Sequence, residues 1–212
     1  LPQFTFLRQD ISDKHIIQTL AKMADGCAAV INLAARAGVR SSVIDPWMYY
    51  HTNVDGALNM LEVCRQHGIP KFVQASSSSV YGNNNPMPYR EDANTDLPLA
   101  PYAASKKASE VLSYSYHYLH GVDVTIFRYF TVFGPAGRPD MSMFRFVQWI
   151  HEGRPVHING DGNQTRGFTY VDDIARGTIQ GLKPLGYEII NLGGHEQISI
   201  NDLVHMVEKK TG

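Results

Sequence analysis

Segments rich in β-branched and apolar residues alternate with segments of helical pattern along the chain. The predicted strands cover residues 4–7, 28–33, 71–75 and 122–127. The predicted helices cover residues 14–24, 45–67 and 101–120. This alternation predicts an α/β fold, a doubly wound parallel sheet with helices on both faces. Ligands of such sheets bind beyond the carboxyl ends of the strands, so we expect the functional residues there.

Tyr102 and Lys106 stand four residues apart near the start of the predicted helix over residues 101–120. Residues at this spacing are neighbours on a helix. The lysine ammonium then stabilises the phenolate and lowers the pKa of the tyrosine from its ordinary value of about 10. Of eleven tyrosines, only Tyr102 has a lysine four residues on. The pair predicts an acid/base site, although surface helices also carry such pairs for solubility.

A serine run, residues 76–79, ends the apolar segment before this helix. Together, Ala75-Ser-Ser-Ser-Ser-Val-Tyr-Gly82 and Pro101-Tyr-Ala-Ala-Ser-Lys-Lys107 resemble the extended short-chain dehydrogenase/reductase family, and within it the nucleotide-sugar epimerases. Further blocks agree in order at residues 32–40, 53–56, 128–131 and 166–174. Ordered blocks are more specific than any single motif. The resemblance implies a partial NAD-binding Rossmann-like domain over residues 1–131. It also implies a substrate-binding portion over residues 132–212, partly interleaved with the first domain.

Family members open with a strand, a glycine-rich phosphate turn and a helix N-terminus that binds the cofactor pyrophosphate. This sequence contains no such turn; the glycine pair Gly160 and Gly162 lacks a third glycine and a preceding strand. Residues 4–11 resemble the family's third strand, and the chain begins with Leu1 rather than Met. Residues 201–212 resemble a helix in the middle of the substrate domain. We therefore expect a fragment that lacks the N-terminal glycine-rich unit and is truncated at the C-terminus.

The resemblance implies NAD-dependent 4-epimerisation of a UDP-sugar through a transient 4-keto intermediate. In the related epimerases, NAD takes a hydride from C4 while a tyrosine removes the 4-hydroxyl proton, and the hydride returns to the opposite face. By resemblance, Tyr102 is the acid/base, Lys106 lowers its pKa and binds the nicotinamide ribose, and Ser77 binds the 4-oxygen. The other serines, Ser76, Ser78 and Ser79, could share that task. The alternative for each is a strand-end turn in which hydroxyls satisfy backbone groups.

Cofactor and nucleotide contacts follow from the same resemblance. Asp10 and Ile11 match the adenine-contacting pair, and Asn53 matches a helix asparagine near the dinucleotide. The cofactor-facing loop contains Leu33, Ala34 and Ala35. On the substrate side, Arg166 matches a ligand of the sugar-nucleotide pyrophosphate, but Gly167 replaces the aspartate that usually follows it. The segment that resembles the uracil-contacting strand consists of Val156, His157 and Ile158.

Two features bear on the sugar. Ser78 and Ser79 stand where dehydrating relatives carry an Asp-Glu pair, so dehydration is disfavoured. Thr131 and residues 134–141 resemble the corresponding segment of UDP-glucuronate 4-epimerases, in which the threonine and an arginine seven residues later hold the sugar carboxylate. Arg138 is therefore the predicted carboxylate ligand, with a solvated loop arginine as the alternative. A UDP-glucose or UDP-N-acetylglucosamine 4-epimerase, and a truncated or inactive homologue serving as a binding or assembly module, remain open.

Composition sets further limits. A hydrophobic fraction of 43%, a charged fraction of 18% and a net charge of −1 are typical of a soluble α/β enzyme. The charge argues against nucleic acid as a partner, and no apolar run is long enough to predict a membrane span. The histidines lack metal-ligand spacing, so no metal is predicted, and Cys27 and Cys64 are expected to be buried thiols. We expect a cytoplasmic homodimer that pairs through the helices over residues 45–67 and 101–120.

Overall fold

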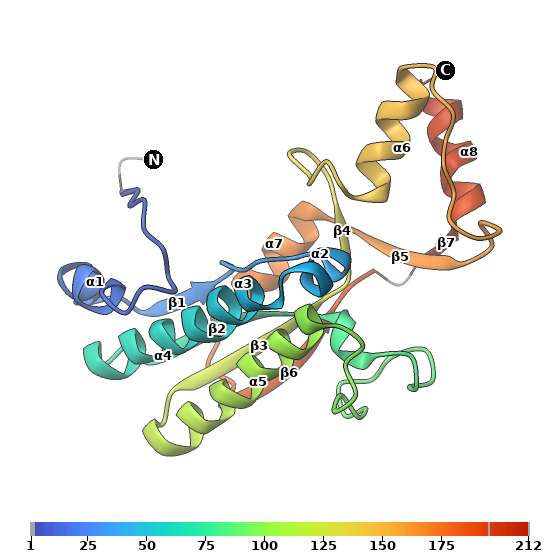
Figure 1. Cartoon of the computed structure of the whole chain (residues 1–212). Helices are drawn as coiled ribbons and strands as arrows, with labels where there is room; N and C mark the ends of the chain where they lie inside the picture. The colour runs from blue at the N-terminus through green and yellow to red at the C-terminus, as the bar shows by residue number, and fades with distance from the viewer. Residues whose placement is uncertain (1–2, 195, 212) are drawn as a thin grey trace. The chain divides into compact units, whose positions relative to one another are not determined.

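The computed structural model describes residues 3–194 and 196–211 (Figure 1). The chain divides into two compact units, and each is described by itself. The first unit comprises Leu1–Arg128 and Thr178–Asn191. The second unit comprises Tyr129–Gly177 and Leu192–Gly212. The chain thus leaves the first unit near residue 129 and returns to it for one short segment.

The first unit is built on a four-stranded sheet with the order β1-β2-β3-β6. The strands are β1 (Ala29–Asn32), β2 (Lys71–Ser77), β3 (Asp123–Tyr129) and β6 (Tyr187–Leu192). β1 and β2 are parallel, and their register places Asn32 opposite Gln74. The predicted α/β class with a parallel sheet is confirmed, as are three of the four predicted strands, within one or two residues at each end.

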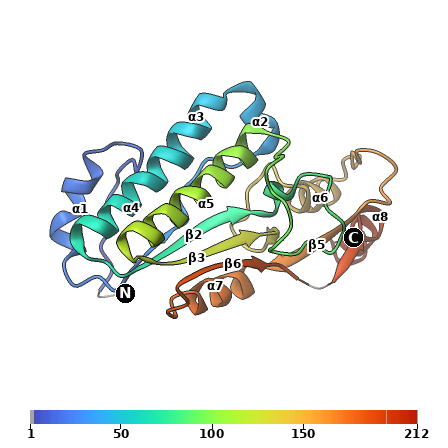
Figure 2. The same ribbon diagram turned by 90° about the horizontal axis from the view of Figure 1, so that it is seen from below.

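The helices of the first unit cover the predicted ranges, and a further helix over residues 39–44 was not predicted. They are α1 (Ile16–Ala24), α2 (Val39–Ile44), α3 (Pro46–Tyr50), a π-helical turn (His51–Asp55), α4 (Gly56–His67) and α5 (Pro101–His120). Figure 2 shows α4 and α5 side by side along one face of the sheet. Between the sheet and these helices lies a core that includes Leu61, Phe72 and Ile126. Its burial holds both helices against β2.

α5 owes its limits and its close packing to local sequence. Pro101 occupies the first turn, and Gly121 caps the end with a left-handed backbone (φ 67°). Two small buried residues, Ser109 and Ser113, each donate to a carbonyl one turn back, so their hydroxyls are satisfied within the helix. The single hydroxyl hydrogen of Ser109 is shared between that carbonyl, of Ser105 at 3.0 Å, and the carbonyl of Asn53 at 2.9 Å. Small side chains on this face therefore let α5 lie close to the π-helical turn.

The predicted strand over residues 4–7 is wrong. These residues form no strand, and Phe4 and Phe6 are 70% and 74% exposed. A strand is stabilised by a neighbouring ladder of backbone hydrogen bonds and by packing of one face. Residues 4–7 have neither in the described part of the chain, so β-propensity alone does not produce a strand there.

The second unit contains a three-stranded sheet, β4-β5-β7, and two long helices. The strands are β4 (Thr131–Phe133), β5 (Thr165–Tyr170) and β7 (Gln197–Ser199). β5 runs parallel to β4 and antiparallel to β7. α6 (Ser142–His151) and α8 (Ile200–Thr211) pack together around Phe146 and Leu203. The helix expected over residues 201–212 is confirmed as α8, and Gly212 lies outside the described residues. α7 (Val171–Gln180) spans the division between the units.

Candidate functional site

Lys106 and Tyr102 lie on the first turns of α5. The Lys106 side chain is buried, and its Nζ donates to the carbonyl oxygen of Ala75 in β2 at 2.8 Å. Burial lowers the pKa of Lys106 from 10.5 to about 8, because the ammonium loses hydration. Tyr102 is half-buried and meets the ring of Tyr49 edge-on, with the centroids 6.2 Å apart. The predicted pair thus stands beside the carboxyl end of β2.

The serine run begins at that end of β2 and its members differ in role. Ser77 is the last residue of the strand, and its Oγ accepts from the backbone N–H of Ser79 at 3.1 Å. Accepting this bond does not use the hydroxyl's own hydrogen, which can still be donated. Ser78 and Ser79 are half-buried in the 3₁₀ turn that follows. The expectation for Ser76 is corrected: alternation along the strand turns it to the α5 side, where its Oγ donates to Glu110 Oε1 at 2.6 Å.

Glu110 belongs to a buried ion pair that sequence reasoning did not find. Arg128 Nε and Nη2 donate to the two carboxylate oxygens of Glu110 at 2.9 and 2.8 Å. Both side chains are about 1% exposed. Arg128 Nη1 also donates to Tyr81 Oη and to the carbonyl of Glu91, each at 3.0 Å. Arg128 lies in a block that resembled a substrate-side segment, but the structure gives it this structural role.

Asn53 fastens the loop after β1 to α5. Its Oδ1 accepts from the N–H of Arg36 at 2.7 Å, and its Nδ2 donates to the carbonyl of Arg36 at 3.0 Å and to Ser105 Oγ at 2.9 Å. Ser105 Oγ in turn donates to the carbonyl of Tyr102 at 2.8 Å. Both amide hydrogens of Asn53 are therefore bonded to protein groups. The side chain positions the predicted cofactor-facing loop relative to the acid/base pair.

The other predicted cofactor residues lie on exposed chain near that loop. Leu33 and Ala34 are exposed and Ala35 is half-buried. Asp10 Oδ1 accepts from the hydroxyl and the backbone N–H of Ser12, and these bonds lower the pKa of Asp10, so it is a carboxylate at neutral pH. The Ile11 side chain packs on Gly56, where a β-carbon would lie 2.7 Å from Ile11 Cδ1. A glycine at that position of α4 thus lets the 10–11 segment approach the helix.

Apart from the serine run, the predicted sugar and nucleotide residues lie in the second unit. Thr131 opens β4, and Arg138 lies in the loop that follows, where its guanidinium forms a two-pronged pair with the Asp140 carboxylate. Arg166 is exposed on β5, and its Nη1 donates to the carbonyl of Thr165 at 2.8 Å. The first unit thus carries the predicted acid/base and cofactor residues and the serine run, and the second unit carries the predicted carboxylate and nucleotide ligands.

The predicted uracil-contacting strand is corrected. Residues 156–158 are assigned to no strand. Val156 and Ile158 are half-buried against the core of α6 and α8. His157 between them is exposed and meets Trp149 edge-on at 5.5 Å. Alternation of the side chains is present, but the apolar pair packs inward and only His157 is exposed for a ligand.

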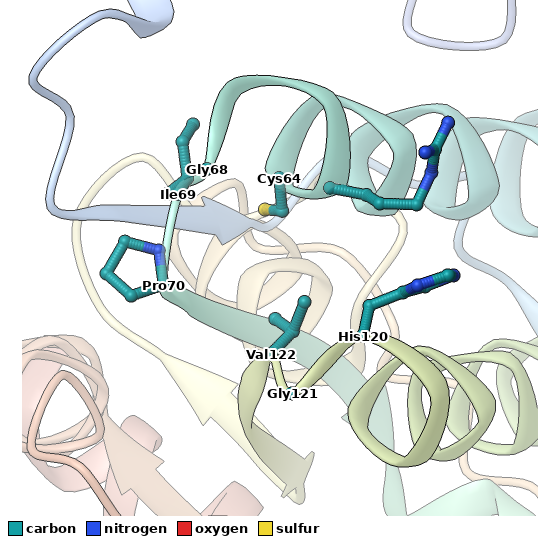
Figure 3. Close-up of a pocket in the computed structure, with 8 residues that line it drawn as sticks. Cys64, Gly68, Ile69, Pro70, His120, Gly121 and Val122 are labelled. Carbon is teal, nitrogen blue, oxygen red and sulfur yellow. The ribbon is translucent and has the colours of Figure 1, made fainter.

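A pocket of about 140 Å³ lies at the opposite end of the sheet from Ser77 (Figure 3). It is lined by the ends of α4 and α5 and by Pro70 and Val122, which precede β2 and β3. Burial raises the pKa of Cys64 in this pocket to about 12, so the thiol is a poor nucleophile. Cys64 is buried as expected, whereas the expectation for Cys27 is wrong because it is exposed. The pocket carries no part of the predicted chemistry.

Within residues 3–194 and 196–211 there is no cluster of three or more side chains suited to hold a metal ion. No helix in the same ranges is long and apolar enough to cross a membrane.

Lys106 is bonded to β2 near the carboxyl end of this strand, and Ser77 ends the strand beside it. Residues 1–193 match the NAD dependent epimerase/dehydratase family. The chain belongs to this family. A relative named UDP-glucuronate 4-epimerase from Thermodesulfobacterium geofontis (strain OPF15) is 54% identical over 210 residues, which cover 99% of this chain and 64% of that relative. UDP-glucuronate 4-epimerase 1 of Arabidopsis thaliana is 40% identical, over 94% of this chain and 51% of its own length.

Solved structures of epimerases have the same fold as this chain. The UDP-glucuronic acid 4-epimerase from Bacillus cereus in complex with UDP-glucuronic acid and NAD is 39% identical, with a TM-score of 0.87 over 97% of this chain and 65% of that one. A UDP-glucose 4-epimerase from Thermotoga maritima with UDP-glucose is 28% identical, with a TM-score of 0.92 over 100% of this chain and 70% of that one. The chain therefore spans about two thirds or less of the first relatives' length.

Proposed function

We propose that this chain carries the acid/base centre of an NAD-dependent 4-epimerase that acts on UDP-glucuronate through a 4-keto intermediate. The observation that carries the proposal is the buried Lys106 bonded to Ala75 near the end of β2, with Tyr102 one helical turn before Lys106 and Ser77 two residues beyond Ala75. The 54% identity to a UDP-glucuronate 4-epimerase supports the choice of sugar.

The protein groups divide the proton chemistry among them. NAD, when bound, supplies the hydride acceptor and donor for C4 of the sugar. Tyr102 takes the proton of the 4-hydroxyl and later returns it, and the Lys106 ammonium favours the phenolate that does so. Ser77 donates its hydroxyl hydrogen to the oxygen on C4, where charge develops. Lys106 uses one of its three N–H donors on Ala75, so two remain for the phenol and the nicotinamide ribose.

The residues present fit part of the NAD molecule. The loop after β1 offers Leu33 and Ala34 at an exposed surface, anchored by Asn53, and the Asp10 carboxylate suits a ribose hydroxyl or adenine donor. These groups and Lys106 would hold the two ends of the dinucleotide. The sequence of residues 1–212 offers no glycine-rich turn for the pyrophosphate. This chain by itself therefore supplies an incomplete cofactor site.

Arg138 supports a uronate as the sugar. Two nitrogen atoms of its guanidinium already donate hydrogen bonds to a carboxylate, that of Asp140. This fork geometry is the one that arginine uses for carboxylates in general, so a sugar carboxylate can take the same place. The TM-score of 0.92 to a UDP-glucose 4-epimerase favours a neutral UDP-sugar as the second candidate.

We also propose that the protein is a homodimer that pairs through α3, α4 and α5. Apolar side chains on the outer face of α5 support this, since Val111, Tyr118 and Leu119 are 55%, 77% and 67% exposed. Light scattering of the protein and of a Tyr118→Arg variant measures the mass directly. A monomeric parent at micromolar concentration contradicts the proposal.

The substrate is tested with kcat/KM for UDP-glucuronate and UDP-glucose in an active epimerase that contains this chain and in its Arg138→Leu variant. An unpaired sugar carboxylate should cost about 2–5 kcal/mol in UDP-glucuronate recognition, and neutral sugars should lose much less. Arg154→Leu, which removes an exposed arginine paired with Glu152, is the matched control. Equal losses on both sugars, or a parent that prefers UDP-glucose, refute the carboxylate role and favour the neutral sugar.

A further inference from the structure

Two buried amide side chains stand beside the carbonyl that receives Lys106. Asn32 in β1 and Gln74 in β2 lie opposite each other in the parallel register and are 5% and 1% exposed. Asn32 Nδ2 donates to Gln74 Oε1 at 3.0 Å, and Gln74 Nε2 donates to the carbonyl of Ala75 at 3.0 Å. Phe72, on the same face of β2, packs in the apolar core. Burying amides there is costly unless they are bonded, so the arrangement calls for a reason.

Gln74 and Lys106 share one acceptor. Lys106 Nζ donates to the Ala75 carbonyl at 2.8 Å, and a carbonyl oxygen has lone pairs for two donors. Because that oxygen only accepts, Gln74 must present its N–H to it, and its Oε1 must then face Asn32, which must donate. The hydrogen bonds therefore have a single direction, from Asn32 through Gln74 to the oxygen that holds Lys106.

We propose that Asn32 and Gln74 are positioning residues that hold the Ala75 carbonyl in place for the Lys106 ammonium. This rests on the role proposed above for Lys106 in the acid/base centre. With the acceptor fixed, the ammonium keeps one direction in the buried site, and its other two N–H donors are directed away from β2. Asn32 donates to Gln74 and not to Ala75, so it acts on Lys106 through Gln74.

The charged and titratable neighbours of Lys106 are accounted for by other contacts. Tyr102 precedes it by one turn, and Tyr49 of α3 touches the Tyr102 ring while its Oη donates to Ala37. Glu110, one turn later, is paired with Arg128 of β3. In β2, Lys71 is paired with Asp123 at the far end of the strand. Burial is the cause of the lowered pKa of Lys106, so its ionisation is sensitive to how well Ala75 solvates the ammonium.

The test measures the titration of the Lys106 ammonium directly, in the protein labelled with ¹³C at lysine Cε. The Lys106 resonance is assigned by its loss in Lys106→Met, and its titration midpoint is measured by nuclear magnetic resonance. Asn32→Ala and Gln74→Met should each lower the midpoint by about half a unit or more, because the ammonium loses a fixed acceptor. The Asn32→Ala effect should vanish in the Gln74→Met background, since the two residues act in series. Additive effects, or an Asn32→Ala midpoint equal to that of the parent, overturn the proposal.

Where Asn32→Ala or Gln74→Met leaves the remaining buried amide without a hydrogen-bond partner and so unfolds the chain, a second variant, Gln74→Glu, still tests the proposal. Gln74→Glu keeps the acceptor for Asn32 and places a carboxylate beside the shared oxygen, so the Lys106 midpoint should rise by about one unit or more. Gln180→Glu adds the same charge at an exposed position of α7 and should leave the midpoint unchanged. No change in Gln74→Glu overturns the proposal. The readout needs no turnover, so it is separate from the outcome for the 4-epimerase activity, which is measured as kcat and KM for the same substitutions in an active epimerase that contains this chain.

Discussion

Replacing the buried Lys106 by methionine should change how stability depends on pH. Burial lowers the pKa of Lys106 from 10.5 to about 8. Between these values the unfolded chain binds more protons than the folded chain, so the free energy of unfolding gains from this residue as pH rises. The gain is complete above the unfolded value and is lost as pH falls through the folded value. The gap between the two corresponds to about 3 kcal/mol, at roughly 1.4 kcal/mol per pKa unit.

The assay is urea unfolding of the parent and of Lys106→Met between pH 7 and pH 11. The parent should gain about 3 kcal/mol relative to the variant across this range. Cys64 acts in the opposite sense, because burial raises its pKa to about 12, but it is common to both proteins and cancels in the difference. Lys183→Met removes an exposed lysine and serves as the matched control. Parallel curves for parent and Lys106→Met would show that the buried lysine is not held in this way.

Three further predictions follow from the same contacts. In an active epimerase, Tyr102→Phe should retain the fold and lose turnover by roughly 10²–10⁴, while Tyr118→Phe on the exposed side of α5 keeps it; unchanged kcat in the first variant rules out the assignment. Glu110→Gln should destabilise the chain by about 3–5 kcal/mol in urea unfolding, because Arg128 is left as an unpaired buried charge, whereas Asp92→Asn in an exposed pair should have no measurable effect. Comparable changes in the two would contradict the buried pair. Calorimetric titration of residues 1–212 with NAD should show weak or no binding, and micromolar affinity would refute the need for a phosphate turn within the chain.

The local sequence already indicated α1, α4 and α5 and the spacing of the proposed acid/base pair. Pro101, the run of helix formers and Gly121 place α5 over the predicted residues, and the spacing of Tyr102 and Lys106 puts both on one side of it. Periodicity and caps act within a few residues, so they can be read from the chain. The family resemblance added roles to residues at the strand ends, and the family match over residues 1–193 confirmed its source.

Only the tertiary structure decided which buried polar groups meet. Ser76 bonds to Glu110 across 34 residues of sequence, and Asn32 bonds to Gln74 across 42. Residues 4–7 have the composition of a strand but no ladder in the described part of the chain, so they do not form one. Partner choice of this kind depends on which strands lie side by side and which face each side chain takes, and a local pattern does not contain that information.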